Sequence, residues 1–169
     1  MKIDGRTAAE LLGIFGIIAS LVFVGMQLSL DRRVAEADQY FNRSESRKAD
    51  LRALLESEFY MEETERRWTN GDRPSWWNDN YESIAIELGL SPINIRVIII
   101  EGTMSFIHLD GIYHQYQAGL IEEEVWEASR DSIRSLIRPP IFRAVFLNEG
   151  PDLPLRAVVR DIVEEGENQ

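Results

Sequence analysis

The sequence has no cysteine, and this absence excludes several kinds of chemistry at once. Disulfides, cysteine-ligated zinc, iron–sulfur clusters and thiol catalysis all need that side chain. Histidine is rare, with two residues in 169, and neither an HExxH nor a Glu-x-x-His motif occurs. The common zinc-protease and di-iron signatures are therefore missing, as are phosphate-binding glycine loops and nucleophile elbows. The sequence predicts no catalytic, metal-binding or cofactor-binding residue, and we expect no cofactor.

Basic side chains are also scarce. Lysine and arginine total 18 against 29 aspartates and glutamates, which gives a formal net charge of −11. The excess of acid lies beyond residue 50. A polyanion is repelled by such a surface unless one face gathers the arginines, so we expect no nucleic-acid partner.

Charge is absent from one long apolar run, Leu11 to Leu30, in which Ser20, Gln27 and Ser29 are the only polar side chains. A helix of 20 residues spans about 30 Å, the thickness of the hydrocarbon core of a bilayer. A secretory signal peptide has a shorter apolar region, a net positive start and a small-x-small cleavage site. A core helix of a small soluble domain keeps a polar face. We therefore favour a membrane anchor at residues 1–30 over both alternatives.

Basic residues are unevenly placed around this anchor. Five follow it within about 20 residues, whereas two precede it. The positive-inside rule then places the C-terminal bulk of the chain in the cytoplasm. The residues counted are Arg32, Arg33, Arg43, Arg47 and Lys48 after the run, and Lys2 and Arg6 before it.

Small residues recur along the anchor at Ala9, Gly13, Gly16 and Ser20. Spacings of four, three and four place them on one helix face, where a second helix could approach closely. The sequence therefore predicts a membrane-protein partner or a homo-oligomer in addition to the lipid bilayer.

The rest of the sequence predicts helices. Residues 31–68 contain no proline or glycine and carry apolar residues at helical spacing, so a juxtamembrane helix should continue from the anchor over residues 31–69. Ser44 and Lys48 interrupt its apolar stripe, and we expect a bend or an exposed stretch near them. Trp68, Trp76 and Trp77 bracket the following turn; they should cap the bundle, the alternative being an aromatic platform for a ligand or a membrane surface.

A helical bundle is expected over residues 70–165, before an acidic tail at residues 166–169. Ser91 and Pro92 form a helix start for a central apolar helix that ends before Gly119. The core face of the next helix should comprise Val125, Trp126, Ser129, Ile133, Leu136 and Ile137. The predicted fold class is all-α: an N-terminal transmembrane helix that continues into a long helix, followed by a compact helical bundle.

The central helix carries one group of polar residues, Glu101, Ser105 and His108, with spacings of four and three. A carboxylate beside an imidazole could orient a general base or bind an ion, although a plain solvent face explains the same pattern. Asp110 and His114, four residues apart, are most simply a surface ion pair.

The chain resembles a widespread family of uncharacterised small bacterial inner-membrane proteins that have one N-terminal span and a helical soluble domain. The resemblance rests on Val-Phe-Val-Gly-Met-Gln-Leu at the end of the span and on Gly-Leu-Ile-x-x-x-x-Trp from Gly119 to Trp126. An Arg-Gln-Asn-Thr-like motif typical of the family is replaced here by Ser29-Leu30-Asp31-Arg32. The resemblance implies a bacterial inner-membrane protein and supplies no activity.

Two functions follow as expectations. The first is a non-enzymatic accessory or scaffolding subunit of a membrane protein complex, with one span and a cytoplasmic bundle. The alternative is a membrane-tethered enzyme or ion-binding sensor that uses Glu101, Ser105 and His108.

Overall fold

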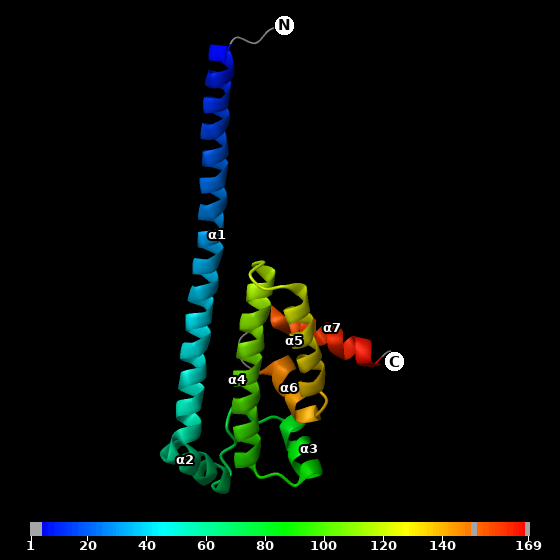
Figure 1. Ribbon diagram of the computed structural model, residues 1–169. Helices are drawn as coiled ribbons and strands as arrows, with labels where there is room; N and C mark the ends of the chain where they lie inside the picture. Colours follow the sequence, from blue (N-terminus) through cyan, green and yellow to red (C-terminus); the bar gives the residue numbers. More distant parts are fainter. Residues whose placement is uncertain (1–4, 150–151, 168–169) are drawn as a thin grey trace. The chain divides into compact units, whose positions relative to one another are not determined.

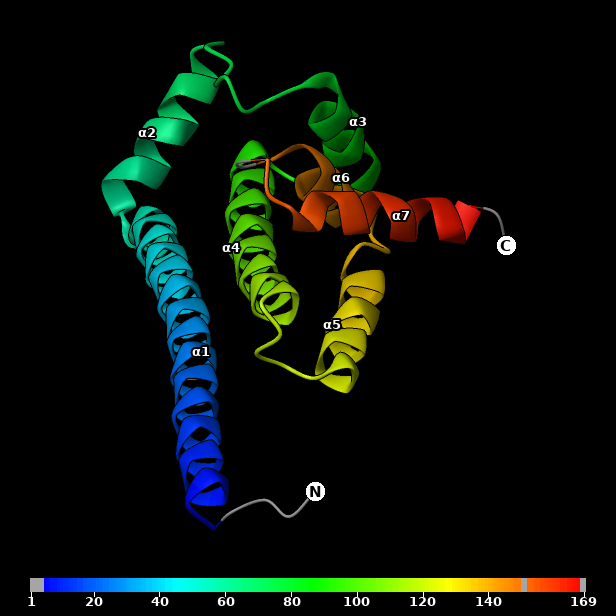
Figure 2. The ribbon, with the colours of Figure 1, turned by 90° about the horizontal axis from the view of Figure 1, so that it is seen from above.

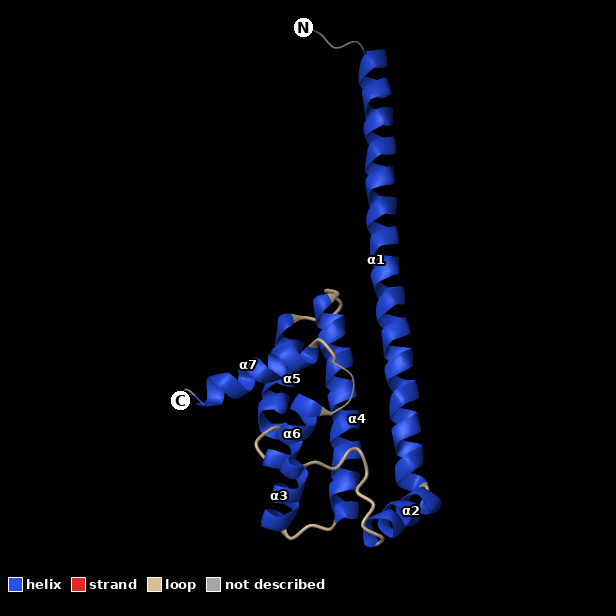
Figure 3. Ribbon diagram, turned by 180° about the vertical axis from the view of Figure 1, so that it is seen from behind, coloured by secondary structure: helices blue, strands red, loops and turns tan. Residues whose placement is uncertain are grey.

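The computed structural model describes residues 5–149 and 152–167, and these residues form seven helices and no strand (Figures 1 and 3). The predicted all-α fold, with a long apolar N-terminal helix followed by a compact helical region, is confirmed. The helices are α1 (Gly5–Glu56), α2 (Glu58–Thr69), α3 (Asp79–Leu88), α4 (Pro92–Gln117), α5 (Glu123–Leu136), α6 (Pro140–Asn148) and α7 (Leu155–Glu167).

The chain divides into two compact units between Gln39 and Tyr40, a point inside α1. In the first unit every side chain from Glu10 to Leu30 is exposed. Among the described helices α1 alone is long and apolar enough to cross a membrane by itself. Helices α3 and α4 pass the same test only as a pair bent by 113°, and much of α4 lies in the protein core.

Near Ser44 and Lys48 the expected bend is not found, because α1 runs through both residues as one helix. The alternative, an exposed stretch, is found at residues 41–43 and 45–47, although Ser44 itself is buried. The interruption lies at Ser57, where the backbone is extended and the side-chain oxygen accepts a hydrogen bond from the amide of Tyr60 at 3.2 Å. Serine in this position satisfies an otherwise unpaired amide of the next helix and so favours a new start there. The predicted juxtamembrane helix is therefore divided between the end of α1 and α2.

Helix α4 is the centre of the second unit and contacts α2, α3, α5, α6 and α7. Its start is a capping box: the Ser91 side chain accepts from the amide of Asn94, and the Asn94 side chain accepts from the amide of Ser91. Gly119 follows its end with φ of +69°, a conformation that glycine adopts without strain. Both ends predicted from the sequence are confirmed.

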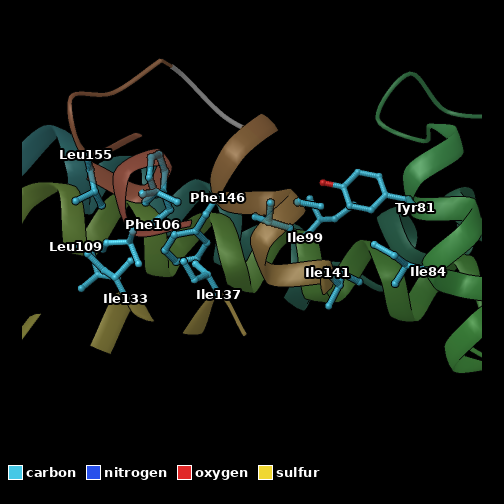
Figure 4. Packing of buried hydrophobic residues seen from close by; sticks show 14 of the residues in the cluster. Tyr81, Ile84, Ile99, Phe106, Leu109, Ile133, Ile137, Ile141, Phe146 and Leu155 are labelled. Carbon is cyan, nitrogen blue, oxygen red and sulfur yellow. The ribbon is translucent and has the colours of Figure 1, made fainter. Parts of the chain in front are cut away.

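The core lies between α4 and the helices α3, α5, α6 and α7 (Figure 4). Phe106 of α4 and Phe146 of α6 meet edge to face with ring centroids 5.3 Å apart. At Gly102 the two helices approach so closely that an added Cβ would lie 3.0 Å from the Val145 side chain. Figure 2 shows α7 crossing over α6, which closes this side of the core.

Helix α5 buries part of its predicted face. Trp126, Ile133 and Ile137 are buried, but Val125 is 51% exposed, so its assignment to the core was wrong. Val125 is the neighbour of Trp126, and residues adjacent in sequence point about 100° apart on a helix. The large indole, packed on Tyr113 and Tyr116 with centroids 4.9 and 5.4 Å away, occupies the core-facing position instead.

The tryptophans around the turn pack onto the bundle. Trp77 meets Trp68 and Trp76 with ring centroids 4.6 and 5.7 Å apart, and both Trp76 and Trp77 lie partly buried against the core. The guanidinium of Arg96 lies 5.0 Å from the Trp76 ring centroid. At the other end of the unit α7 extends to Glu167, so the first half of the predicted tail is helical, and residues 168–169 lie outside the described residues.

Candidate functional site

The predicted polar group on α4 keeps its shared face but not its expected contacts. The Ser105 hydroxyl donates to the backbone carbonyl of Glu101 at 3.0 Å, as serines inside helices commonly do. Glu101 is exposed, and within the described residues no hydrogen bond or ion pair joins its carboxylate to the imidazole of His108. The arrangement expected for a carboxylate-oriented base is not formed here.

Ser105 and His108 instead open into a groove that Glu101 does not line. The groove encloses about 500 Å³ between the end of α1, α4 and α5, all within residues 40–169. We call it the His108 groove; its lining residues are Lys48, Arg52, Met104, Ser105, His108, Leu109, Ile112, Ala128, Ser129, Ser132 and Leu136.

The His108 groove combines cationic groups with an aliphatic floor. No acidic residue is among its lining residues. The Lys48 ammonium pairs with Glu45, and its side chain is 17% exposed, whereas Arg52 is exposed and has no ion pair with any described residue. The hydroxyls of Ser129 and Ser132 donate to backbone carbonyls of α5 at 2.9 and 3.0 Å, which leaves their oxygen lone pairs as acceptors. A molecule with an anionic end and an apolar body complements this lining.

A smaller hollow of about 180 Å³ shares Lys48, His108 and Ile112 with the His108 groove. It adds Phe41, Glu45 and Gly111, among others, from the facing sides of α1 and α4. His108 is exposed and lines both hollows on this side of α4.

Asp110 lies in the core and is not part of a surface ion pair, contrary to expectation. It is 1% exposed. One carboxyl oxygen accepts a short hydrogen bond from the hydroxyl of Tyr40, and the other accepts from the amide of Leu155 at 3.1 Å. His114 does not meet Asp110 in an ion pair but stacks on the Tyr40 ring, with centroids 4.2 Å apart and planes 17° apart.

The Asp110 carboxyl therefore joins three helices. Leu155 is the first residue of α7, so its amide is one of the four that a helix leaves unpaired at its start. Burial, and then the hydrogen bond and negative charge of Asp110, raise the pKa of the Tyr40 hydroxyl above its usual range. Asp110 follows the buried Phe106 by four residues, and this spacing was the available sign that it belongs to the core face.

The small residues predicted to pack against another helix lie in the first unit. Gly13, Gly16 and Ser20 are exposed, and a Cβ built at either glycine meets nothing within 4 Å. The Ser20 hydroxyl donates to the backbone carbonyl of Gly16 at 2.8 Å, so it needs no other partner. Ala9 belongs to the same helix.

No group of three or more histidine, aspartate or glutamate side chains in the described part of the chain is placed to hold a metal ion. Comparisons with models of known protein families, with curated proteins and with solved structures found no match. The resemblance to small single-span membrane proteins stays a prediction.

Proposed function

We propose that this chain is a single-pass protein of a bacterial inner membrane and serves as a non-enzymatic accessory or scaffolding subunit of a membrane protein complex. The observation that carries the proposal is the exposure of every side chain from Glu10 to Leu30 in one uninterrupted helix. A run of 20 uncharged and mostly apolar residues exposed to water is unfavourable, and a bilayer is the solvent in which it is stable.

The orientation of the proposed span follows from its flanking charges. Lysine and arginine within about 20 residues of a span decide its direction, and acids contribute little. Because five basic residues follow the apolar run and two precede it, residues 40–169 are placed on the cytoplasmic side. In this arrangement residues 40–169 are tethered to the membrane through α1.

A partner helix is proposed to pack on the face of Gly13, Gly16 and Ser20. In a bilayer, helices associate through close backbone approach, and glycine permits the closest approach. A Cβ built at Gly13 or Gly16 meets nothing within 4 Å, so packing within the described chain does not require glycine at either position.

The test begins with purification of the full chain from its own membranes in mild detergent and mass analysis of whatever remains bound. We expect a stoichiometric membrane-protein partner. The variant Gly13→Leu/Gly16→Leu should lose it, because two leucines separate the helices while keeping the span apolar. Gly25→Leu is the matched control: Gly25 lies nine residues after Gly16, about 180° around the helix, and its Cβ also meets nothing within 4 Å.

Two results would contradict the proposal. A complex that survives Gly13→Leu/Gly16→Leu would show that this face is not the contact. A wild-type chain that purifies alone, or only with copies of itself, would show that it is not an accessory subunit.

A second candidate is a membrane-tethered sensor that binds a small molecule in the His108 groove. The observation that favours it is the gathering of Lys48, Arg52 and His108 around an aliphatic floor without an acidic lining residue. A panel of aliphatic and aromatic carboxylates should then contain compounds that raise the melting temperature of the chain. Arg52→Gln and His108→Ala should abolish the shift, while Glu101→Gln, which lies outside the groove, should preserve it. A shift that persists in both groove variants would place the ligand elsewhere.

A further inference from the structure

A second cleft lies at the C-terminal end of α5 and is not part of the His108 groove. It encloses about 410 Å³ between the end of α5, the residues that lead into α6, and the last turns of α7. Three of its lining side chains are arginines, Arg134, Arg138 and Arg143, and Glu165 is its only acidic lining residue. We call it the arginine cleft.

The backbone around the arginine cleft is constrained. Two consecutive prolines, Pro139 just before α6 and Pro140 at its first position, follow the end of α5, and the proline ring restricts φ to a narrow range. Ile137, just before them, is buried and ends α5. The Nε of Arg143 donates to the Ile137 carbonyl at 3.4 Å, so the end of this side chain is held against the linker with its two terminal nitrogens left over. The backbone next to Arg138 is thus restricted by Pro139, and the Arg143 side chain is held by its hydrogen bond.

Glu165 places a carboxylate against the arginines on the α5 side of the cleft. One oxygen of its carboxylate receives a hydrogen bond from Arg130 at 2.7 Å, and the other receives one from Arg134 at 3.2 Å. Arg134 also pairs with Asp131 at 2.6 Å. The arginines on the α5 side therefore already hold an oxyanion that belongs to the chain.

Arg138 and Arg143 bind no oxyanion of the described chain. Within residues 5–149 and 152–167 neither has an acidic partner, although the chain carries an excess of acid. Guanidinium groups bind phosphate through paired, charge-assisted hydrogen bonds. A phosphate monoester, with about 1.5 to 2 negative charges, matches two unpaired guanidiniums better than a carboxylate with one.

We propose that the arginine cleft binds the phosphate group of a phosphate monoester through Arg138 and Arg143. The cleft is much larger than one phosphate, and its floor includes the aliphatic side chains of Ile137 and Ile162, which would contact the apolar body of the ligand. The monoester comes either from a soluble phosphorylated molecule or from a lipid headgroup such as that of phosphatidic acid.

The test uses the full chain in phosphatidylcholine nanodiscs and titrates phenyl phosphate by calorimetry. Wild type should bind saturably, and Arg138→Gln/Arg143→Gln should weaken binding about 100-fold, at about tenfold for each guanidinium lost. Arg66→Gln removes an exposed arginine outside the cleft that pairs with Glu63, and it should bind like wild type.

Glu165→Gln provides an independent arm with the opposite sign. Removal of this carboxylate takes away one of the two acidic partners of Arg134, which keeps Asp131, and of Arg130, which keeps Glu127. It also removes the only acidic lining residue of the cleft, so phenyl phosphate should bind several-fold more tightly. A merely destabilised variant would not gain affinity, and this arm therefore remains informative if the double arginine variant fails to fold.

A change in the lipid of the nanodiscs distinguishes the two sources of the phosphate group. Nanodiscs with phosphatidic acid should weaken phenyl phosphate binding, relative to discs with the same amount of phosphatidylglycerol, if the headgroup fills the cleft. Equal binding in both discs identifies a soluble ligand. The proposal is overturned if Arg138→Gln/Arg143→Gln binds phenyl phosphate as tightly as wild type, or if Glu165→Gln brings no gain.

Discussion

Replacement of Asp110 by alanine should destabilise the second unit by about 1.5–4.5 kcal/mol. The Leu155 residue is fully buried, so its amide would lose its partner in a place that water does not reach, at about 1–3 kcal/mol. The hydroxyl of Tyr40 would lose a second hydrogen bond, with a net value of about 0.5–1.5 kcal/mol. Both losses come from the same carboxyl, and the free energy of unfolding should fall by their sum.

Two gentler variants separate these contributions. Asp110→Asn keeps a carbonyl oxygen for the Leu155 amide and gains an NH₂ group that can donate to the Tyr40 oxygen, so it should cost less than about 1.5 kcal/mol. Tyr40→Phe removes only the hydroxyl and keeps the ring that stacks on His114. The double variant Tyr40→Phe/Asp110→Ala should lose less free energy of unfolding than the sum of the two single losses, because both changes delete the same hydrogen bond.

The measurement is denaturant unfolding of the full chain in detergent micelles, followed by tryptophan fluorescence. All four tryptophans lie in residues 40–169, so the signal reports the second unit. Asp131→Ala is the control, because that carboxylate is 73% exposed and pairs with Arg134 at the surface, and it should change stability by less than about 1 kcal/mol. If the free energy of unfolding of Asp110→Ala lies within about 0.5 kcal/mol of the wild-type value, the inference that the Asp110 carboxyl holds α7 in place is wrong.

Three further results are expected from the same unfolding assay. Gly111→Ala should stabilise the second unit by about 0.5–1 kcal/mol, since alanine favours a helix and an added Cβ meets nothing within 4 Å. Gly102→Ala should bring no gain in stability, because its Cβ would press on α6, and equal effects of the two variants would contradict the close approach of α4 and α6. Burial and a neighbouring carboxylate raise the pKa of Tyr40 and of Tyr81, so the stability that their neutral hydroxyls contribute is complete below pH 10 and should fall as the pH rises above 10. Tyrosinate absorbance should then appear together with the loss of helix, and ionisation of these tyrosines before the helix is lost would refute this expectation. Ser91→Ala should cost about 1 kcal/mol by deleting the cap of α4, and a change below about 0.3 kcal/mol would show that the capping box is dispensable.

The features that the sequence predicted correctly are those with local causes. Ser91, Pro92 and Gly119 act within one turn of their own position, through an unpaired amide, a restricted φ or a positive φ. The apolar run needs nothing but its own length and composition. Such features can be read from neighbouring residues without knowledge of the rest of the fold.

The features that it missed depend on distant residues. The partners of Asp110 are Tyr40 and Leu155, which lie 70 and 45 positions away, whereas the surface pair expected with His114 rested on a spacing of four. The break at Ser57 is a local signal of the same kind as Ser91, but it was hidden by the helix formers on both sides. Tertiary packing decides between such competing local patterns, and the sequence around each residue does not contain it.

The arginine cleft and the His108 groove both place unpaired cations in a chain of net charge −11, and electrostatic screening explains how such sites can function. At physiological ionic strength the screening length is about 8 Å, so an anion inside either hollow interacts mainly with the side chains that line it. The excess acid elsewhere on the chain then has little effect on the affinity of either hollow for a small anion. The arrangement of a few arginines, and not the net charge, should therefore decide which anions the two proposed sites bind.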